Sequence, residues 1–365
     1  MKRLLFNVHP GLTYNPHHPY FWKEPEFLAR LYERGYELEL KSPLDEADWI
    51  MFFDATAVGR WRVSLESRMR RMAKLVVRGN DGFRDLYGEA VGKGMRDRLV
   101  LMLHEGQVPV PENFSPKLHA MFDTILTWHD GLVDNERFFL FRLPTALRWP
   151  SITPIPFAEK KLLTCILTNS YAPRRSTLPT RRAAIRYFEQ RWPHQFDLYG
   201  NKWNQPATRL QRLFPRTTPI YASYRGYLDE ALKAETLSKY RFNLCYENCD
   251  EQPGWISNRL FESMRSDNVA VFLGGTNVTD VVSRDAFVDR RQFRSNRELG
   301  DFLESVTEAD YERYRAAMKR CLAGPSFDAF RTTTLADTIA DVLDLRGRQK
   351  EGRAAPRERR EAAVT

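Results

Sequence analysis

The stretch that decides the fold is residues 240–275, YRFNLCYENCDEQPGWISNRLFESMRSDNVAVFLGG. Its apolar run at residues 242–246 predicts a buried strand, and residues 258–265 have the spacing of a helix. The run at residues 269–273, closed by two glycines, predicts a second strand. A strand, a helix and a strand in this order form one unit of a parallel sheet. The segment therefore predicts an α/β fold.

Strand and helix patterns alternate along the rest of the chain as well. Apolar runs at residues 99–103 and 161–167 predict buried strands in the two halves of the sequence. Between the halves, residues 144–156 contain four prolines, a density that no long helix or strand tolerates. We therefore expect two α/β domains, over residues 1–150 and 151–345, with ligands at the carboxyl ends of their parallel strands.

The composition is that of a soluble globular protein. Of the 365 residues, 42% are hydrophobic and 28% are charged, and no run of about 18 apolar residues occurs that could cross a membrane. The N-terminal apolar run is too short for a signal peptide. No C-x-x-C pair supports a zinc or thiol-redox motif, and a reducing cytoplasm fits the four cysteines, which are Cys165, Cys245, Cys249 and Cys321.

Much of the excess positive charge behind the net charge of +9 lies near the C-terminus. Residues 346–365 are predicted to form a basic, disordered tail, and contact with an anionic membrane or a partner is the alternative. No recognised nucleic-acid-binding motif accompanies the charge, so a nucleic-acid partner is not expected. The basic side chains of the tail are Arg346, Arg348, Lys350, Arg353, Arg357, Arg359 and Arg360.

The densest group of candidate functional residues follows the strand at 242–246. Glu247 and Asn248 stand at its carboxyl end, where an open α/β sheet places ligand contacts. Ser257 or Asn258 then caps a helix whose free N–H groups favour an anion, and Arg259 adds a positive charge in the first turn. This pattern predicts a phosphate site. A capped surface helix with an exposed arginine is the alternative interpretation.

Four blocks in order resemble the signature of the family 10 glycosyltransferases, the α-1,3/1,4-fucosyltransferases, in a bacterial-type member. They are residues 240–248, 255–261, 268–274 and 287–289, and the resemblance extends over about residues 165–321. It implies a GT-B glycosyltransferase fold, in which two Rossmann-like domains face each other across a cleft. The N-terminal domain would bind the acceptor and the C-terminal domain would bind GDP-fucose.

Three positions depart from the family pattern. The family's Glu and Lys in the second block are Asn258 and Arg259 here, and its Tyr is Trp255. Arginine keeps the positive charge and can grip a phosphate at two points, and tryptophan can still stack on a base or ribose. Asparagine loses the negative charge, which leaves another GDP- or UDP-sugar donor open as an alternative.

Further donor contacts are expected upstream of the signature. The resemblance assigns the diphosphate to an arginine after Asn169, for which Arg175 is the first choice, while Arg174, Arg181 and Arg182 compete. A preorganised cation there would stabilise the charge that develops on the departing diphosphate. The full set of predicted nucleotide-sugar-binding residues is Asn169, Arg174, Arg175, Tyr199, Glu247, Asn248, Trp255, Ser257, Asn258 and Arg259.

The family takes its catalytic base from a glutamate near the end of a strand in the N-terminal domain. Glu105, after the run at 99–103, matches that setting and is our predicted base. His104 is an alternative base, because a neutral imidazole can accept a proton near pH 7. A structural role for Glu105, in capping a helix or pairing with an arginine, is a further alternative.

Together these features predict a metal-independent, inverting transferase that moves fucose or a related sugar from GDP-fucose to a glycan hydroxyl, as an α-1,3-fucosyltransferase. No cofactor is expected, and the chain has no Asp-x-Asp triplet for a divalent ion. The acceptor would be a glycan of a protein or of lipopolysaccharide. We expect the protein in the cytoplasm, with the tail as a candidate contact with the inner face of the membrane. A catalytically silent protein that binds glycans or nucleotides is the alternative from another functional class.

Overall fold

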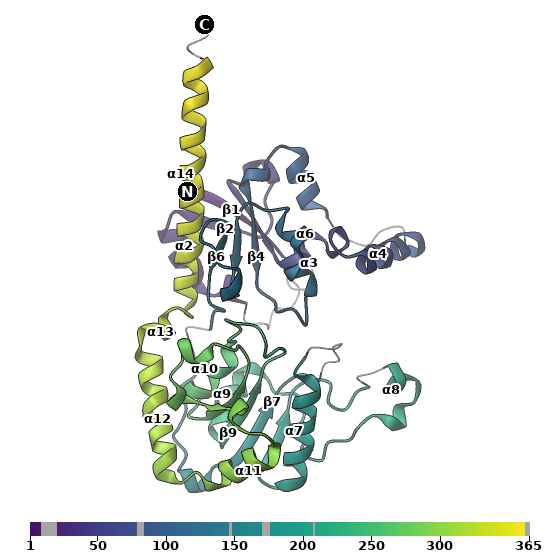
Figure 1. Ribbon diagram of the computed structural model, residues 1–365, viewed down its shortest axis with the longest axis vertical. Helices are drawn as coiled ribbons and strands as arrows, with labels where there is room; N and C mark the ends of the chain where they lie inside the picture. The colour runs from purple at the N-terminus through teal and green to yellow at the C-terminus, as the bar shows by residue number, and fades with distance from the viewer. Residues whose placement is uncertain (9–19, 79–83, 146–147, 170–175, 207–208, 362–365) are drawn as a thin grey trace. The chain divides into compact units, whose positions relative to one another are not determined.

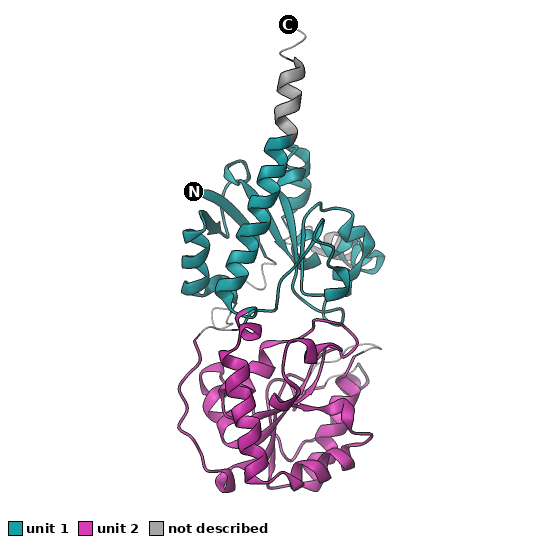
Figure 2. Ribbon diagram, turned by 60° about the vertical axis from the view of Figure 1, so that its left-hand side comes forward, with its two compact units in different colours: residues 1–146, 329–365 teal, residues 147–328 magenta. Residues whose placement is uncertain are grey.

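A computed structural model describes residues 1–8, 20–78, 84–145, 148–169, 176–206 and 209–361 (Figure 1). The chain divides into two compact units (Figure 2). Unit 1 consists of Met1–Ala146 and Ala329–Thr365, and unit 2 consists of Leu147–Asp328. Each unit contains one parallel sheet with helices beside it, which confirms the predicted α/β fold.

Unit 1 is built on a six-stranded sheet in the order β2-β1-β3-β4-β5-β6. All strand pairs are parallel. Every residue of the central strands β3 and β4 is buried, because parallel sheets are covered on both faces. The strands are β1 (Lys2–Asn7), β2 (Tyr36–Glu39), β3 (Trp49–Phe53), β4 (Leu99–Leu103), β5 (Ile125–Thr127) and β6 (Phe138–Leu140). The helices are α2 (Pro25–Glu33), α3 (Asp54–Val58), α4 (Leu65–Arg78), α5 (Leu86–Gly92), α6 (Pro116–His119) and α14 (Thr332–Glu361).

Unit 2 is built on a five-stranded parallel sheet in the order β11-β10-β9-β7-β8. The β9-α10-β10 unit occupies its centre, as residues 240–275 predict. The strands are β7 (Lys161–Ile166), β8 (Phe196–Tyr199), β9 (Tyr240–Tyr246), β10 (Val269–Leu273) and β11 (Val288–Asp289). The helices are α7 (Leu178–Arg191), α8 (Arg209–Leu213), α9 (Lys233–Ser238), α10 (Asn258–Arg265), α11 (Asn296–Ser305), α12 (Glu308–Ala323) and α13 (Pro325–Asp328).

The last helix lies with unit 1, although the sequence pattern assigned residues 329–345 to the C-terminal domain. Asp337 on α14 binds Arg30 of α2 at 3.0 Å and Arg34, the residue after α2, at 2.8 Å. Asp344 accepts hydrogen bonds from the Tyr36 hydroxyl, at 2.6 Å, and from Lys2. These partners stand some 300 residues earlier in the chain, so helical periodicity alone gave no indication of them.

The predicted disordered tail also differs from the structure, because α14 continues through Glu361. Near the start of the tail, the Arg346 guanidinium donates to the backbone carbonyls of Asp123 and Glu136. The Lys350 ammonium lies 3.1 Å from an Asp97 oxygen and 3.8 Å from the Trp49 ring centre. These contacts fix the first turn of the basic segment on unit 1. Within the described residues, no helix is both long and apolar enough to cross a membrane.

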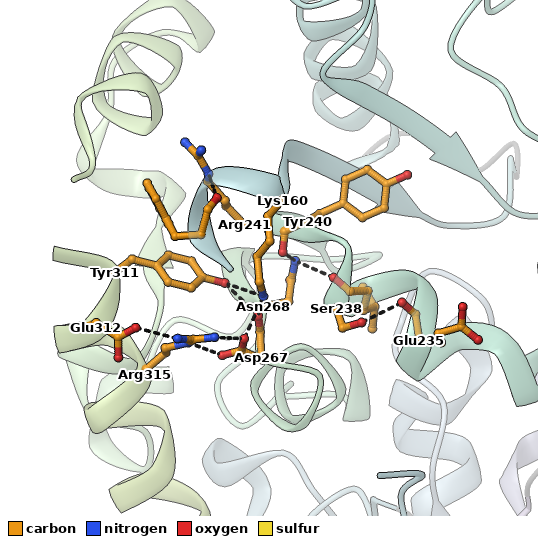
Figure 3. Close-up of polar contacts among 12 residues, drawn as sticks. Lys160, Glu235, Ser238, Tyr240, Arg241, Asp267, Asn268, Tyr311, Glu312 and Arg315 are labelled. Atoms are coloured by element: carbon orange, nitrogen blue, oxygen red, sulfur yellow. Dashed lines mark hydrogen bonds and ion pairs between the residues drawn. The ribbon is translucent and has the colours of Figure 1, made fainter. Parts of the chain in front are cut away.

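A buried ion cluster fixes the amino-terminal edge of the unit 2 sheet (Figure 3). The Lys160 side chain is fully buried, and its ammonium donates to an Asp267 carboxylate oxygen at 2.8 Å. Arg315 of α12 donates to the other Asp267 oxygen at 2.6 Å, and the Tyr311 hydroxyl donates to the Asp267 backbone carbonyl at 2.7 Å. Beside them, the Asn268 amide donates to the Tyr240 carbonyl at 2.9 Å. The α10–β10 turn is thereby held to α12 and to the start of β9.

We expect Asp267→Asn to lower the unfolding free energy of unit 2 by about 3 kcal/mol, because it leaves the buried Lys160 charge without its carboxylate. Asparagine tolerates the positive φ of 53° at this position, so backbone strain does not add to the loss. Urea unfolding measures the change. The double variant Lys160→Met/Asp267→Asn should recover part of the loss, and a single variant as stable as the wild type would contradict this assignment.

Candidate functional site

The carboxyl edge of the unit 2 sheet is organised around Glu247, which directly follows β9 and has an exposed fraction of 0%. Its carboxylate accepts a hydrogen bond from the Ser257 hydroxyl at 2.5 Å and pairs with the Arg259 guanidinium at 2.7 Å. A buried carboxylate is costly unless it is paired and hydrogen-bonded, and both partners come from the start of α10. Glu247 therefore fixes the N-terminus of α10 against the end of β9.

Ser257 is the N-cap of α10, which settles the choice between Ser257 and Asn258. Its hydroxyl oxygen accepts from the Arg259 backbone N–H at 3.4 Å. Asn258 points along its own helix, and its amide donates to Glu262 at 2.7 Å. The other Glu262 oxygen binds the Lys233 ammonium at 2.7 Å. A glutamate at 258 would place a second carboxylate against Glu262 one turn later, which like charges disfavour.

The N-terminus of α7 meets the same strand end. Arg181, with an exposed fraction of 2%, donates to the Tyr246 backbone carbonyl and lies 3.4 Å from the Asn248 side-chain oxygen. Burial, and then the nearby Arg259 charge, lower the pKa of Arg181 to about 10. The Thr177 backbone N–H donates to the Asn248 carbonyl at 3.1 Å. Arg181 and Asn248 are thus brought together, and Arg181 serves to hold the end of β9.

Arg182, the next residue, occupies a different setting. It is partly exposed, and its guanidinium donates to the Asn169 side-chain oxygen at 3.2 and 3.3 Å. Asn169 in turn donates to the Lys202 carbonyl at 3.1 Å, while its backbone N–H donates to the Asn201 carbonyl at 2.8 Å. Asn169 therefore ties the end of β7 to the loop after β8 and presents Arg182 at the same edge of the sheet.

Three arginines gather near the end of β9. Arg259 pairs with Glu247 at 2.7 Å, and the charges of Arg259, Arg182 and Glu247 all act on Arg181. Guanidinium groups beside the N-termini of two helices suit an anion with more than one negative charge.

Two glycines allow the loop before α10 to approach the sheet. A Cβ atom on Gly275 would lie 2.9 Å from the backbone nitrogen and oxygen of Trp255, and one on Gly274 would lie 2.7 Å from the Glu247 Cγ. The Gly275 N–H donates to the Trp255 carbonyl at 2.9 Å. Trp255 itself is buried. This packing does not favour the predicted stacking of its ring on a base or ribose.

Tyr199 lies with a different cluster from Glu247. Its hydroxyl is 3.0 Å from the Tyr240 hydroxyl, which donates to Asp197 at 2.7 Å. Asp197 is also paired with Lys161 and Arg225, at 2.7 and 2.6 Å. Tyr199 is predicted from the sequence to bind the nucleotide sugar together with the residues around Glu247. Its hydroxyl instead contacts the Tyr240 and Asp197 cluster. Arg174 and Arg175 lie outside the described residues.

In unit 1, Glu105 follows β4, and its backbone is held by a residue that the sequence analysis missed. Asp54, buried at the end of β3, accepts from the backbone N–H groups of His104 at 2.7 Å and Glu105 at 3.0 Å. The Asn113 amide donates to Asp54 at 2.6 Å and to the Glu105 carbonyl at 2.9 Å. An acid directly after the apolar run at 49–53 was the available sequence signal.

The surroundings of Glu105 and His104 differ. The His104 ring packs against Phe53, with ring centres 4.7 Å apart, and against Phe21 at 6.3 Å. Burial, and then the Glu105 charge, raise the pKa of Tyr20, which places the Glu105 carboxylate near this phenol. Both residues are partly exposed, but the imidazole of His104 packs in an aromatic cluster, whereas the Glu105 charge acts on the Tyr20 phenol. This arrangement favours Glu105 over His104 as a group that meets a substrate.

Burial raises the pKa of Asp54 to about 7, and the Glu105 charge adds to the effect. Because the folded-state pKa lies above the unfolded value, the Asp54 contribution to stability is fully present below about pH 4 and is lost as the pH rises toward 7. Relative to Asp54→Asn, the wild type should lose about 4 kcal/mol across that interval.

Urea unfolding of both proteins as a function of pH measures this difference. Asparagine suits the positive φ of 65° at residue 54, so the variant removes the titration and keeps the backbone. Parallel pH profiles for the two proteins would contradict the assignment.

Among the residues that the structure describes, no group of three His, Cys, Asp or Glu side chains could hold a metal ion. The predicted independence from metal stays a prediction.

Comparison with known proteins shows what the sequence of unit 2 is similar to. Residues 160–321 match the sequence model of "Glycosyltransferase family 10 (fucosyltransferase) C-term". A 3-galactosyl-N-acetylglucosaminide 4-α-L-fucosyltransferase of Bos taurus, FUT3, is 29% identical over 121 residues. That match covers 31% of this chain and about a third, 33%, of the bovine protein.

Among solved structures, Anabaena HepE in complex with UDP-glucose aligns with 94% of this chain and 100% of its own, at a TM-score of 0.52 and 12% identity. An α1,3-fucosyltransferase aligns with 94% of this chain and 90% of its own, at a TM-score of 0.49 and 13% identity. The chain has the GT-B glycosyltransferase fold, and the resemblance carried by the four sequence blocks is confirmed. Residues 160–321, all within unit 2, are thus similar to the C-terminal domain of the family 10 glycosyltransferases.

Proposed function

We propose that this chain is an inverting glycosyltransferase that transfers fucose from GDP-fucose to a hydroxyl of a glycan acceptor, with α-1,3 linkage. The observation that carries the proposal is the pairing of Arg259 with the buried Glu247, near Arg181 and Arg182, in a segment that matches the family 10 model. A nucleoside diphosphate carries several negative charges and gains more as it departs. Cations held in place before the reaction stabilise that developing charge without reorganisation.

The arginines divide between two roles in this proposal. Arg259, with 29% of its side chain exposed, and Arg182, which is partly exposed, reach the diphosphate. Arg181 is buried, donates a hydrogen bond to the Tyr246 backbone carbonyl and holds the end of β9. Ser257 and Glu247 orient Arg259. Arg174 and Arg175 remain candidates for a further phosphate contact.

The proposed base is Glu105. In a single displacement the acceptor hydroxyl attacks the anomeric carbon, the bond to the diphosphate breaks, and a carboxylate takes the hydroxyl proton. Glu105 must be ionised for this task. Its backbone is fixed at both ends of the residue by Asp54 and Asn113, which limits the positions that its carboxylate can take.

We expect Glu105→Gln to lower kcat by at least about a hundredfold, because the amide cannot accept the proton. GDP binding should be unchanged, since the donor is assigned to unit 2. His104→Gln serves as the matched control and should retain most of the activity. Transfer of labelled fucose to an acceptor glycan library measures the rate. Full transferase activity of Glu105→Gln would show that Glu105 is not the base. If Glu105→Gln left the biological effect of the protein unchanged, the result would favour the alternative of a catalytically silent binding protein.

The two neighbouring arginines offer a sharper test. Arg182→Met should weaken GDP binding by at least about tenfold with little change in stability, because a charged contact to phosphate is lost at a partly exposed position. Arg181→Met should instead lower the unfolding free energy by about 2 kcal/mol, because a buried charged hydrogen bond is removed. Calorimetric titration and urea unfolding separate the two effects.

The same titrations, repeated with UDP, GDP-fucose and GDP-mannose and with or without Mg²⁺, test the donor. Tight binding of GDP-fucose that ignores Mg²⁺ supports the proposal and its metal-independence. Binding of GDP without a preference for fucose, or of UDP instead, supports the alternative donor that Asn258 suggests. Wild-type protein that binds none of these nucleotides would contradict the proposed function.

We further propose that the enzyme works in the cytoplasm, beside the inner face of the membrane. The basic residues after position 345 are the sequence-based candidates for this contact. Two of them, Arg346 and Lys350, contact unit 1. The charge that this segment can offer to a lipid surface is therefore smaller than its sequence indicates.

A further inference from the structure

A second cationic segment, in unit 2, exposes large apolar side chains. Helix α8 and the turn after it stand on a long loop between β8 and β9 (Figure 1). Within eleven residues the loop exposes Leu210 by 60%, Leu213 by 75%, Phe214 by 58% and Ile220 by 87%. We call residues 209–220 the α8 segment. Exposure of this size is unusual for aliphatic and aromatic side chains when several lie close together.

Three of these side chains share one side of the α8 turn. Leu210, Leu213 and Phe214 follow each other at the i, i+3 and i+4 spacing that places residues on one helical face. The Phe214 backbone N–H donates to the Leu210 carbonyl at 2.8 Å, which extends the helical turn to Phe214. The apolar face is therefore produced by regular backbone structure.

The α8 segment is also anchored at its base. The Ile220 carbonyl accepts a hydrogen bond from Arg186 of α7, whose guanidinium lies 3.8 Å from the centre of the Tyr221 ring. That ring packs against Trp203, with ring centres 5.1 Å apart, and Trp203 is fully buried. Contacts before and after the segment therefore hold it in place while its apolar side chains face outward.

The charged residues of the loop that carries the apolar face all have one sign. Residues 200–228 contain no Asp or Glu, and their cations are Lys202, Arg209, Arg212, Arg216 and Arg225. Arg225 is paired with Asp197 of β8. Arg212 and Arg216 are exposed and lie within three residues of Leu213 or Phe214. An apolar tip with exposed cations and no acid in its own loop is complementary to a surface that combines hydrocarbon with negative charge.

We propose that the α8 segment docks unit 2 on an anionic phospholipid surface, with Leu210, Leu213, Phe214 and Ile220 entering the interface and Arg212 and Arg216 binding headgroup phosphates. Interfacial binding needs only apolar side chains and cations on a protruding element. A stable protein–protein interface buries about 800 Å² on each partner. Four apolar side chains on one loop offer too little surface for an interface of that size. The loop itself contains no acid, so it is not complementary to a basic partner. The proposal does not depend on which sugar is transferred.

Cosedimentation of the full chain with vesicles tests the proposal. The wild type should bind vesicles of phosphatidylcholine mixed with phosphatidylglycerol, should bind phosphatidylcholine alone weakly, and should lose binding as salt is raised. Leu213→Ser/Phe214→Ser should lower the partition coefficient by at least about tenfold. Arg212→Glu/Arg216→Glu should remove the preference for the anionic lipid. All four positions are exposed, so the thermal unfolding temperature should not change.

Two matched variants complete the design. Met69→Ser/Met72→Ser removes two equally exposed apolar side chains from α4 of unit 1, and deletion of residues 346–365 removes the basic tail. If both variants still bind anionic vesicles, the result supports the α8 segment as the membrane-docking element. The proposal is overturned if the wild type ignores anionic vesicles, if the Leu213/Phe214 variant binds them normally, or if only the α4 or tail variant loses binding. Sugar transfer is not needed for the readout, so a failure here is distinct from a failure of the proposed activity.

Discussion

The burial of the Glu247 carboxylate is the constraint on which the functional edge of unit 2 depends. A buried carboxylate has to find donors, and the nearest available ones are Ser257 and Arg259 at the start of α10. The backbone carbonyls of residues 246–248 also need hydrogen-bond donors, and these come from Thr177 and Arg181 at the start of α7. The N-termini of α7 and α10 thereby both meet the end of β9, which is an arrangement that suits an anion.

Unit 1 also buries an acid after a central strand, but it satisfies the acid differently. Glu247 is paired with a guanidinium, whereas Asp54 receives neutral N–H groups from His104, Glu105 and Asn113 within the described residues. Without a cation to offset burial, the pKa of Asp54 rises to about 7. This arrangement lowers stability at neutral pH and fixes the backbone of Glu105.

Sequence reasoning found the elements more readily than their partners. The runs at 99–103 and 269–273 are continuous and apolar because parallel strands are covered on both faces, so they could be identified without any contact information. The unit to which α14 belongs depends on Asp337 meeting Arg30, about 300 residues away, and no local pattern contains that pairing. Arg181 and Arg182 are neighbours in sequence, yet one is buried and the other is partly exposed, because a helix turns adjacent side chains by about 100°.

The neighbours of Asn258 explain in physical terms how this position can depart from the family pattern. The residue binds Glu262, one turn later, and Glu262 also binds Lys233 of α9. A negative charge absent from the first turn of α10 is therefore present in the second turn, where a cation of another helix neutralises it. Because the favourable potential of a helix for anions is greatest at its N-terminus, this shift leaves Arg259 as the charged residue of the first turn. The exchange of Glu for Asn thus removes a negative charge from the turn in which the helix potential most favours an anion.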